Sequence, residues 1–406
     1  MKKSSKILLL VITVMTIIMA MTVTSFAETS GDFEYQVLDD GTAVIINYTG
    51  SATNLAIPSK IDGYTVTSIT GLTFIGCDSL QSTKIPDSVT GIGPNAFSNC
   101  TNLKSITIPD SVTLIGVGAF ENTAYYNDEN NWENGALYID NHLIDVNSNL
   151  PSDYTVKSGT ITIADSSFKG CDLVTVTIPD SVVKIGGASL NTSGTCFMYS
   201  DKLTAINVSS NNKYYSSKDG VLFNKDKTTL LQYPIGKAAT EYTIPDTVKT
   251  IGGSAFEDCR SLIGVEIPAS VSYIGYSAFE LYDEDDNYVY IPIKGYKGTY
   301  AETYANENGH EFISLGGPSE TYTGLYKYGD LWCYAKNGKL DYEYTGLAKY
   351  NSKWYYVEDG IKDGSFNGLV EYGKSLYYVK NGVVDKSYTG LVKHSDGKYY
   401  YVKSGV

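Results

Sequence analysis

Aromatic side chains that could bind a sugar or a cation recur near the C-terminal end of the chain. They form four clusters, W-C-Y, W-Y-Y, L-Y-Y and Y-Y-Y, at 332–334, 354–356, 376–378 and 399–401. Sugars stack on such rings, and several rings around one point attract a cation. Packing between neighbouring strands is the alternative use, and we expect each set to serve both. The candidate glycan-binding residues are Trp332, Tyr334, Trp354, Tyr356, Tyr378, Tyr399 and Tyr401.

A second set of polar side chains recurs one residue before the Ile-Pro pair, or its equivalent, of a repeated motif. A row of hydroxyl, amide and charged groups on a stiff sheet could bind a protein or a glycan. The alternative is that threonine simply favours exposed strand positions. The candidate ligand-facing column is Lys84, Thr107, Thr177, Asn207, Thr243 and Glu266.

Catalytic groupings are not found in the sequence. The only histidines, at 142, 310 and 394, fall in three separate regions without metal-ligand spacing. No nucleophile elbow, P-loop or Cys–His grouping is present. The recurring aspartates at 87, 110 and 180 are explained by a turn after proline. We therefore expect no enzyme activity, no metal and no cofactor, although a glycosidase-type carboxylate pair, being defined in space, stays an open alternative.

The polar column belongs to a repeat that organises most of the chain. Ile-Pro-Asp-Ser-Val occurs at 85–89, 108–112 and 178–182, and close variants occur at 244–248 and 267–271. Two of the steps, from Ile85 to Ile108 and from Ile244 to Ile267, are 23 residues. A fixed period of this length is typical of a solenoid with one short unit per turn.

Each repeat predicts a short strand, a turn and a second inward segment. Leu103, Ile106 and Ile108 alternate with polar residues, which is strand patterning. Pro109 ends the strand because proline cannot donate to a ladder. A phenylalanine then enters the core of each turn, at positions 97, 120, 168, 197, 256 and 279.

Capping segments and inserts interrupt the repeat. Phe33–Tyr48 predicts a hairpin that covers the first turn. Ala124–Tyr154 and Lys213–Tyr233 predict hairpin-like inserts, which we expect as loops on one edge of the solenoid. A helix over Thr299–Asn308, followed by Glu311–Leu315, predicts the closing cap.

A second repeat carries the aromatic clusters. G-L-Y-K-Y, G-L-A-K-Y, G-L-V-E-Y and G-L-V-K-H begin at 324, 346, 368 and 390, an even step of 22 residues. Each unit continues to an aromatic cluster and a glycine turn, which predicts a short hairpin. Stacked hairpins again form a linear array.

The N-terminal residues and the net charge limit the possible partners. Residues 1–27 predict a secretory signal peptide, with three lysines before an apolar run and Ser25-Phe26-Ala27 as the cleavage site. Its removal changes the net charge from −14 to −17, because it takes away three lysines and no acid. A chain this acidic repels nucleic acid and anionic membranes.

The first array resembles a known family of bacterial surface proteins. The residues that carry the likeness are I-P-D-S-V, the phrases I-G-P-N-A-F-S-N-C (92–100) and I-G-G-S-A-F-E-D-C (251–259), and G-V-L-F-N-K-D-K (220–227). On these, residues 28–316 resemble the BspA-like leucine-rich repeat family, the Treponema pallidum-type repeat. The resemblance implies a surface-exposed protein, often an adhesin, without catalytic residues.

The second array, residues 320–406 after a linker at 317–319, is similar to the choline-binding-type repeats that bind bacterial cell walls. The likeness rests on phrases such as Lys353-Trp354-Tyr355-Tyr356, although each unit opens with Gly-Leu where the family has Gly-Trp. It implies a wall polysaccharide or teichoic acid as partner, or a purely structural array.

The sequence therefore predicts a mainly β fold, a leucine-rich-repeat solenoid followed by a β-hairpin repeat array. We expect a secreted, wall-associated binding protein or adhesin, whose solenoid recognises a host or environmental protein or glycan. The alternatives are a structural surface-layer component and a wall-associated glycan hydrolase or its accessory protein.

Overall fold

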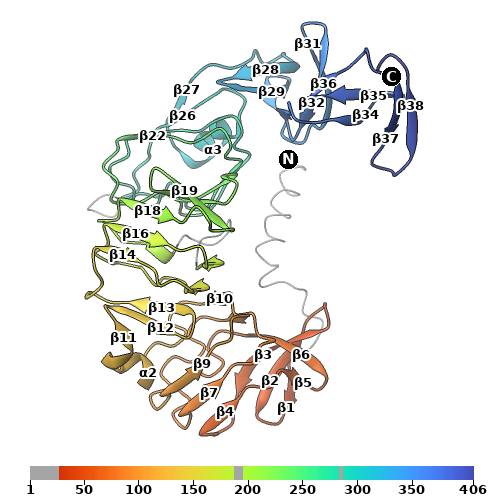
Figure 1. Cartoon of the computed structure of the whole chain (residues 1–406). Helices are drawn as coiled ribbons and strands as arrows, with labels where there is room; N and C mark the ends of the chain where they lie inside the picture. The colour runs from red at the N-terminus through yellow and green to blue at the C-terminus, as the bar shows by residue number, and fades with distance from the viewer. Residues whose placement is uncertain (1–26, 187–194, 283–286) are drawn as a thin grey trace.

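The protein is almost entirely built from short strands that follow one another in a curved array (Figure 1). The structure, a computed structural model, describes residues 27–186, 195–282 and 287–406. All but the last residue of the predicted signal peptide lies outside these ranges. The predicted mainly β class, a solenoid followed by hairpins, is confirmed.

The short strands near the Ile-Pro motif, or its equivalent, stack in parallel in three separate sheets, which we together call the proline ladder. Ser82, Thr83 and Lys84 pair in register with the residues 23 positions later. Ile106 and Ile108 are buried, whereas Thr107 is exposed, as the alternation predicts. The ladder consists of β4 (Asn54–Ala56), β7 (Ser82–Lys84), β9 (Ser105–Thr107), β14 (Asp153–Thr155), β16 (Thr175–Ile178), β18 (Ala205–Val208), β22 (Glu241–Thr243), β24 (Gly264–Glu266), β26 (Ile293–Gly295) and β27 (Phe312–Ser314).

A second set of parallel strands, the glycine ladder, forms where the chain returns after the turn and is likewise divided among three sheets. Its strands end in isoleucine and are mostly followed by glycine. The glycine is required because coils approach closely there: an added Cβ on Gly93 would overlap the backbone nitrogen of Gly71. The ladder contains β6 (Tyr64–Ile69), β8 (Gly91–Ile92), β10 (Leu114–Ile115), β15 (Thr162–Ile163), β17 (Lys184–Ile185), β23 (Thr250–Ile251) and β25 (Tyr273–Ile274), and β5 (Lys60–Ile61) pairs with β6.

The solenoid consists of three blocks, and each block begins with an antiparallel meander of three strands. The last strand of each meander pairs in parallel with the next strand of the glycine ladder. The hairpins predicted in the two inserts are present, but their expected place as loops on one edge is wrong. Ala136, Leu143 and Phe223 are completely buried, because the inserts supply strands and core to the array. The meanders are β1 (Glu28–Ser30), β2 (Phe33–Val37) and β3 (Thr42–Tyr48); β11 (Trp132–Glu133), β12 (Ala136–Ile139) and β13 (His142–Val146); and β19 (Tyr215–Lys218), β20 (Val221–Asn224) and β21 (Thr229–Gln232).

The buried phenylalanines form one aromatic stack within each block. Phe74 and Phe97 lie 4.7 Å apart and nearly parallel, and Phe97 and Phe120 lie 5.4 Å apart. The second block stacks Phe168 on Phe197. The third block stacks Tyr233, Phe256 and Phe279. The predicted aromatic column is therefore present, in three segments.

Short helices lie at the insert and at the C-terminal cap. Helix α2 (Ala124–Asn127) and the 3-10 turn η1 (Glu129–Asn131) lead into the second meander, and η2 (Thr195–Phe197) carries the last phenylalanine of the second block. Helix α3 (Tyr300–Asn308) ends at Gly309 in the left-handed conformation, and β27 then extends the proline ladder. Within the described ranges no helix is long and apolar enough to cross a membrane.

Four hairpins follow the solenoid. Each of the first three adds a short third strand, and single bridges from Cys333 to Ile361 and from Tyr355 to Val383 join consecutive hairpins into one sheet. The strands are β28 (Gly324–Tyr328), β29 (Leu331–Lys336) and β30 (Lys339–Leu340); β31 (Gly346–Tyr350), β32 (Lys353–Glu358) and β33 (Ile361–Lys362); β34 (Gly368–Tyr372), β35 (Ser375–Lys380) and β36 (Val383–Val384); and β37 (Gly390–Lys393) and β38 (Tyr399–Val402).

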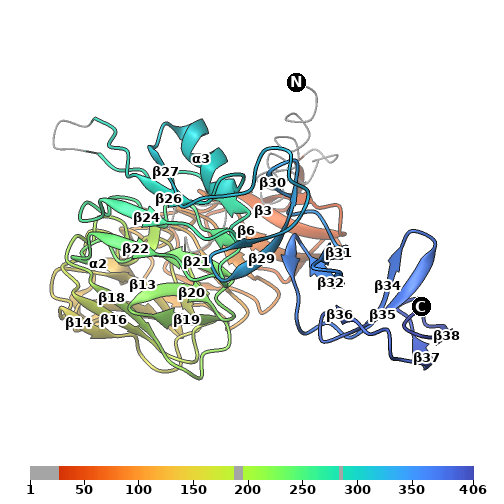
Figure 2. The same cartoon turned by 90° about the horizontal axis from the view of Figure 1, so that it is seen from above.

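The first hairpin packs directly on the solenoid cap. The Leu340 amide donates to the Gly298 carbonyl oxygen at 2.8 Å, and the Tyr300 amide donates to the Tyr342 hydroxyl oxygen at 3.0 Å. Ala269 of the solenoid shares a buried apolar cluster with Tyr328 of the hairpin. The later hairpins extend away from the solenoid (Figure 2).

Candidate functional site

The tryptophans of the hairpin array pack against the next hairpin. Trp332 lies 4.5 Å from Tyr350, and Trp354 lies 4.7 Å from Tyr372, between ring centroids. Each tryptophan is the second residue of its strand, β29 or β32. Its ring reaches the tyrosine that ends the first strand of the following hairpin. The candidate rings Trp332 and Trp354 therefore line the junctions between hairpins.

The candidate tyrosines two positions later stack on an aromatic residue that lies just before the opening strand of the next hairpin. Tyr334 lies 3.8 Å from Tyr344, Tyr356 lies 3.9 Å from Phe366, and Tyr378 lies 4.0 Å from Tyr388. The Tyr344 hydroxyl donates to the Leu347 carbonyl oxygen at 2.6 Å and fixes the start of the next repeat. One face of Tyr334, Tyr356 and Tyr378 is thus covered by a partner ring. Tyr399 and Tyr401, in contrast, are 67% exposed.

A small pocket opens at the first junction between hairpins. Its volume is about 110 Å³, and it is lined by Leu325, Trp332, Tyr350, Tyr355 and Lys362. The Lys362 ammonium lies 4.8 Å from the centre of the Tyr355 ring. Three rings around one cation form the arrangement that attracts an ammonium group. Here the chain's own lysine lies against one of these rings.

Sequence reasoning did not select Tyr350, Tyr355 or Lys362 of this pocket. The signal that could have found them is the 22-residue step, which sets a tyrosine at the end of each of the first three opening strands. The junctions are not equivalent, because Val384 stands 22 residues after Lys362. At the second junction, which contains Trp354, Tyr372 and Tyr377, no lysine takes the position of Lys362, but the Lys349 ammonium lies 6.0 Å from the centre of the Trp354 ring.

The candidate column on the solenoid is divided among the three blocks. Lys84 pairs with Thr107 on the first block, Thr177 with Asn207 on the second, and Thr243 with Glu266 on the third. Lys84, Thr107, Asn207 and Thr243 are exposed, and Thr177 and Glu266 are half-buried. The structure therefore places these side chains in three short rows rather than one.

Among the described residues, the polar partners of the three histidines include the carbonyl oxygens of Pro109 and Ile291 and the carboxylate of Asp396. His142 and His310 are buried, and burial lowers the pKa of both imidazoles. His394 lies near Asp396 in the turn of the last hairpin, with 3.3 Å between the Nδ1 and Oδ1 atoms. In the part of the chain that the structure describes, no group of three or more His, Cys, Asp or Glu side chains could hold a metal ion.

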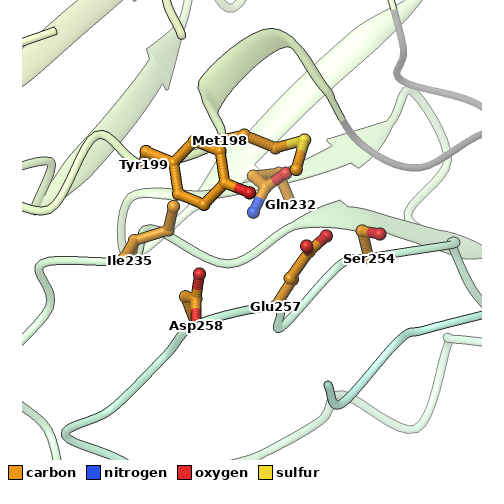
Figure 3. Close-up of a pocket in the computed structure, with 7 residues that line it drawn as sticks. All are labelled: Met198, Tyr199, Gln232, Ile235, Ser254, Glu257 and Asp258. Atoms are coloured by element: carbon orange, nitrogen blue, oxygen red, sulfur yellow. The ribbon is translucent and has the colours of Figure 1, made fainter. Parts of the chain in front are cut away.

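The boundary between the second and third blocks holds a closely packed polar pocket (Figure 3). Met198, Tyr199 and Gln232 face Glu257 and Asp258 across it. Burial raises the pKa of both carboxyl groups. The pocket leaves no room for a water-sized molecule, so this boundary is closed to a ligand.

Comparison with protein families identifies both arrays. A model of the BspA type leucine-rich repeat region matches residues 67–195 and 236–306 in six copies. A model of the choline-binding repeat matches residues 321–341, 343–363, 365–385 and 387–406. Both repeat types are binding modules rather than catalytic domains. No curated protein matches the chain.

Three solved structures illustrate the similarity. A leucine-rich repeat protein from Eubacterium ventriosum is 25% identical with a TM-score of 0.34; the match covers 67% of this chain and 66%, just under two thirds, of that chain. A leucine rich cell surface protein from Faecalibacterium prausnitzii is 27% identical with a TM-score of 0.29, covering 63% and 74%. The leucine rich repeat protein of T. pallidum is 20% identical with a TM-score of 0.27, covering 71% and 98%.

The matched residues include most strands of the proline and glycine ladders and all four hairpins. The 23-residue coils and the 22-residue hairpins are thus two known repeat types joined end to end. The chain is a BspA-type leucine-rich repeat protein that carries choline-binding repeats at its C-terminal end.

Proposed function

We propose that this is a secreted cell-surface binding protein of a bacterium, an adhesin held non-covalently on the cell wall by its hairpin array. The four choline-binding repeats would bind choline carried by wall teichoic acid or a wall polysaccharide. The solenoid would present its exposed ladder faces to a host or environmental protein or glycan. The predicted signal peptide accounts for export.

One observation carries the wall attachment. Trp332, Tyr350 and Tyr355 surround a pocket that Lys362 also lines, with its ammonium over one ring. Rings of this kind attract ammonium groups, and each contact contributes roughly 0.5–2 kcal/mol depending on how well it is desolvated. A quaternary ammonium of choline matches that chemistry.

A sedimentation experiment tests the attachment. Purified full chain is mixed with isolated cell walls that carry choline, and we expect it to pellet and to be released by free choline. Trp354→Ala should weaken pelleting, because it removes a ring of the second junction, where the nearest cation of the chain, Lys349, lies 6.0 Å from the ring centre. Tyr276→Ala, which changes an exposed tyrosine of the solenoid, is the matched control.

Two results would contradict the proposal. Pelleting that resists both free choline and Trp354→Ala would exclude the junction pockets as the attachment site. A chain that stays in the supernatant would favour the structural role of the hairpins, to which the stacks of Tyr334 on Tyr344 and Tyr356 on Phe366 already contribute.

Binding by the solenoid is tested separately. The full chain is applied to arrays of matrix proteins and glycans in the presence of saturating choline, which occupies the hairpin pockets. Saturable binding that persists under these conditions supports recognition by the solenoid. Absence of any saturable binding would favour a surface-layer component instead.

A further inference from the structure

The regular hydrogen bonding between coils is partly broken at the end of the first block, where the Asp165 amide still donates to the Ile115 carbonyl oxygen at 2.9 Å. In the preceding coil the Asn95 and Phe97 amides donate to the Val117 and Ala119 carbonyl oxygens at 3.0 and 2.8 Å. The equivalent donors one coil later are the amides of Gly118 and Phe120. For neither of them is an acceptor present among the described residues. Gly118 is half-buried and Phe120 is buried, and both residues line the same cavity, so their amides can donate to a group bound there.

A cleft explains the break. A cavity of about 390 Å³ separates the coil segment 116–121 from the segment 165–170, with Ile144 and Asp145 of β13 also lining it. The second meander, which supplies β13, holds the two coils apart. This volume falls within the range of about 300–1,000 Å³ that is typical of ligand pockets. The corresponding boundary after the second block is closed by Met198, Gln232 and Ile235, so an insert alone does not create the space.

The cleft presents hydrogen-bond acceptors in fixed positions. Glu121, Asp145 and Asp165 line it. The Tyr126 hydroxyl donates to Asp145 Oδ2 at 2.6 Å, and the Val146 amide donates to Asp145 Oδ1 at 2.8 Å. These two hydrogen bonds fix the orientation of the Asp145 carboxylate. Asp145 itself is half-buried. Each oxygen retains a further lone pair for a ligand donor.

Donors and an aromatic surface complete the lining. The Lys169 ammonium and the free amides of Gly118 and Phe120 supply donors to the same cavity. Tyr199 lines the cavity and is 51% exposed. The Lys169 ammonium lies 5.4 Å from the centre of the Tyr199 ring. Sugar hydroxyls both donate and accept, and the apolar face of a sugar ring packs on an aromatic side chain.

We propose that this inter-block cleft binds one or two sugar residues of an uncharged glycan. The proposal rests on the solenoid having a ligand, and it assigns that ligand a chemical class and a place. A basic peptide side chain would pair with Glu121 and Asp145, but it would leave the Gly118 and Phe120 amides unpaired and would be repelled by Lys169. The hydroxyl groups of a sugar can pair both with the carboxylate acceptors and with the amide and ammonium donors. The walls also limit the site to a short segment.

The test measures binding of uncharged oligosaccharides to the full chain with choline present. Three variants alter the cleft through exposed residues, so that folding is preserved: Val117→Trp narrows it, Lys169→Ala removes a donor, and Tyr199→Ala removes the ring. We expect each to raise the Kd at least tenfold. Ile75→Trp, an equally exposed position on the first coil, and Asp180→Asn, an exposed turn carboxylate, are the controls and should leave the Kd unchanged.

The possible outcomes separate this inference from the proposed function. Failure of every uncharged saccharide to bind, or binding that the three variants do not change, overturns the cleft assignment. Binding of a lysine-rich peptide that the same variants abolish also overturns it, and makes the cleft a peptide site. If a protein ligand still binds all three variants normally, the solenoid keeps its proposed role and only the cleft assignment fails.

Discussion

The rings of Phe97 and Phe120 lie 5.4 Å apart and within 9° of parallel, although the residues are 23 positions apart in the sequence. Both side chains are almost completely buried. Each coil therefore covers the aromatic ring of its neighbour, and the coils of a block fold as one unit rather than singly. The stability of the solenoid should depend strongly on these stacks.

Phe97→Ala should destabilise the protein by about 3–5 kcal/mol, because it removes the central ring of a three-ring stack and leaves a cavity. Denaturant unfolding followed by circular dichroism measures the change. Val117→Ala, which shortens an exposed side chain in the next coil, is the control and should stay within about 0.5 kcal/mol of the parent chain. A similar loss for both variants would contradict this account of the core.

Gly93→Ala should also destabilise, by about 1–3 kcal/mol, because the new Cβ would overlap the backbone of Gly71 in the adjacent coil. The coils would have to move apart to accommodate it. Gly364→Ala, where an added Cβ meets nothing within 4 Å, is the matched control. Thermal melts of the two variants side by side decide the matter, and equal melting temperatures would show that the glycine ladder tolerates separation.

Lys362→Met should tighten choline binding, since it removes a cation that lies over the Tyr355 ring and repels the ligand. A cation–ring contact of about 0.5–1 kcal/mol corresponds to a change in Kd of roughly two- to fivefold. Tryptophan fluorescence during a choline titration gives the Kd. Lys380→Met, on an exposed position of the third hairpin, controls for the change in net charge. Unchanged or weaker binding by Lys362→Met would indicate that the first pocket does not take choline.

Acidification should weaken the fold through its buried histidines. Burial lowers the pKa of His142 and His310, so the neutral form stabilises the native state above about pH 6.5 and this stabilisation is lost as the pH falls below that value. For His142, Asp110 and Asp140 oppose the shift but do not reverse it. The melting temperature should therefore fall between about pH 7.5 and pH 5.5.

His142→Gln isolates this effect. Half-buried carboxyl groups such as Asp145, whose pKa is raised by desolvation, give the opposite trend, but they contribute equally to both proteins. The fall in melting temperature over the same pH interval should be smaller in the variant. An equal fall in both proteins would show that His142 does not titrate with unfolding.

The repeats themselves could be predicted from the sequence. A 23-residue step with Ile-Pro and a 22-residue step with Gly-Leu report local and recurring requirements: alternation for a strand, proline where it must stop, glycine where coils touch, phenylalanine at the centre. The same patterns located the N-terminal hairpin and the C-terminal cap. All of these features depend on residues close together in the chain.

Only the tertiary structure determined which side chains of one repeat contact which side chains of another. Trp332 and Tyr334 are two positions apart in the sequence, but only the folded array packs one ring on Tyr350 of the next hairpin and the other on Tyr344 in the segment between the hairpins. Likewise, only the packing of β13 against two blocks turns an insert into a wall of the core and opens the cleft beside Phe120. A periodic pattern specifies each unit, whereas contacts between units follow from register and from the path of the inserts, which no period encodes.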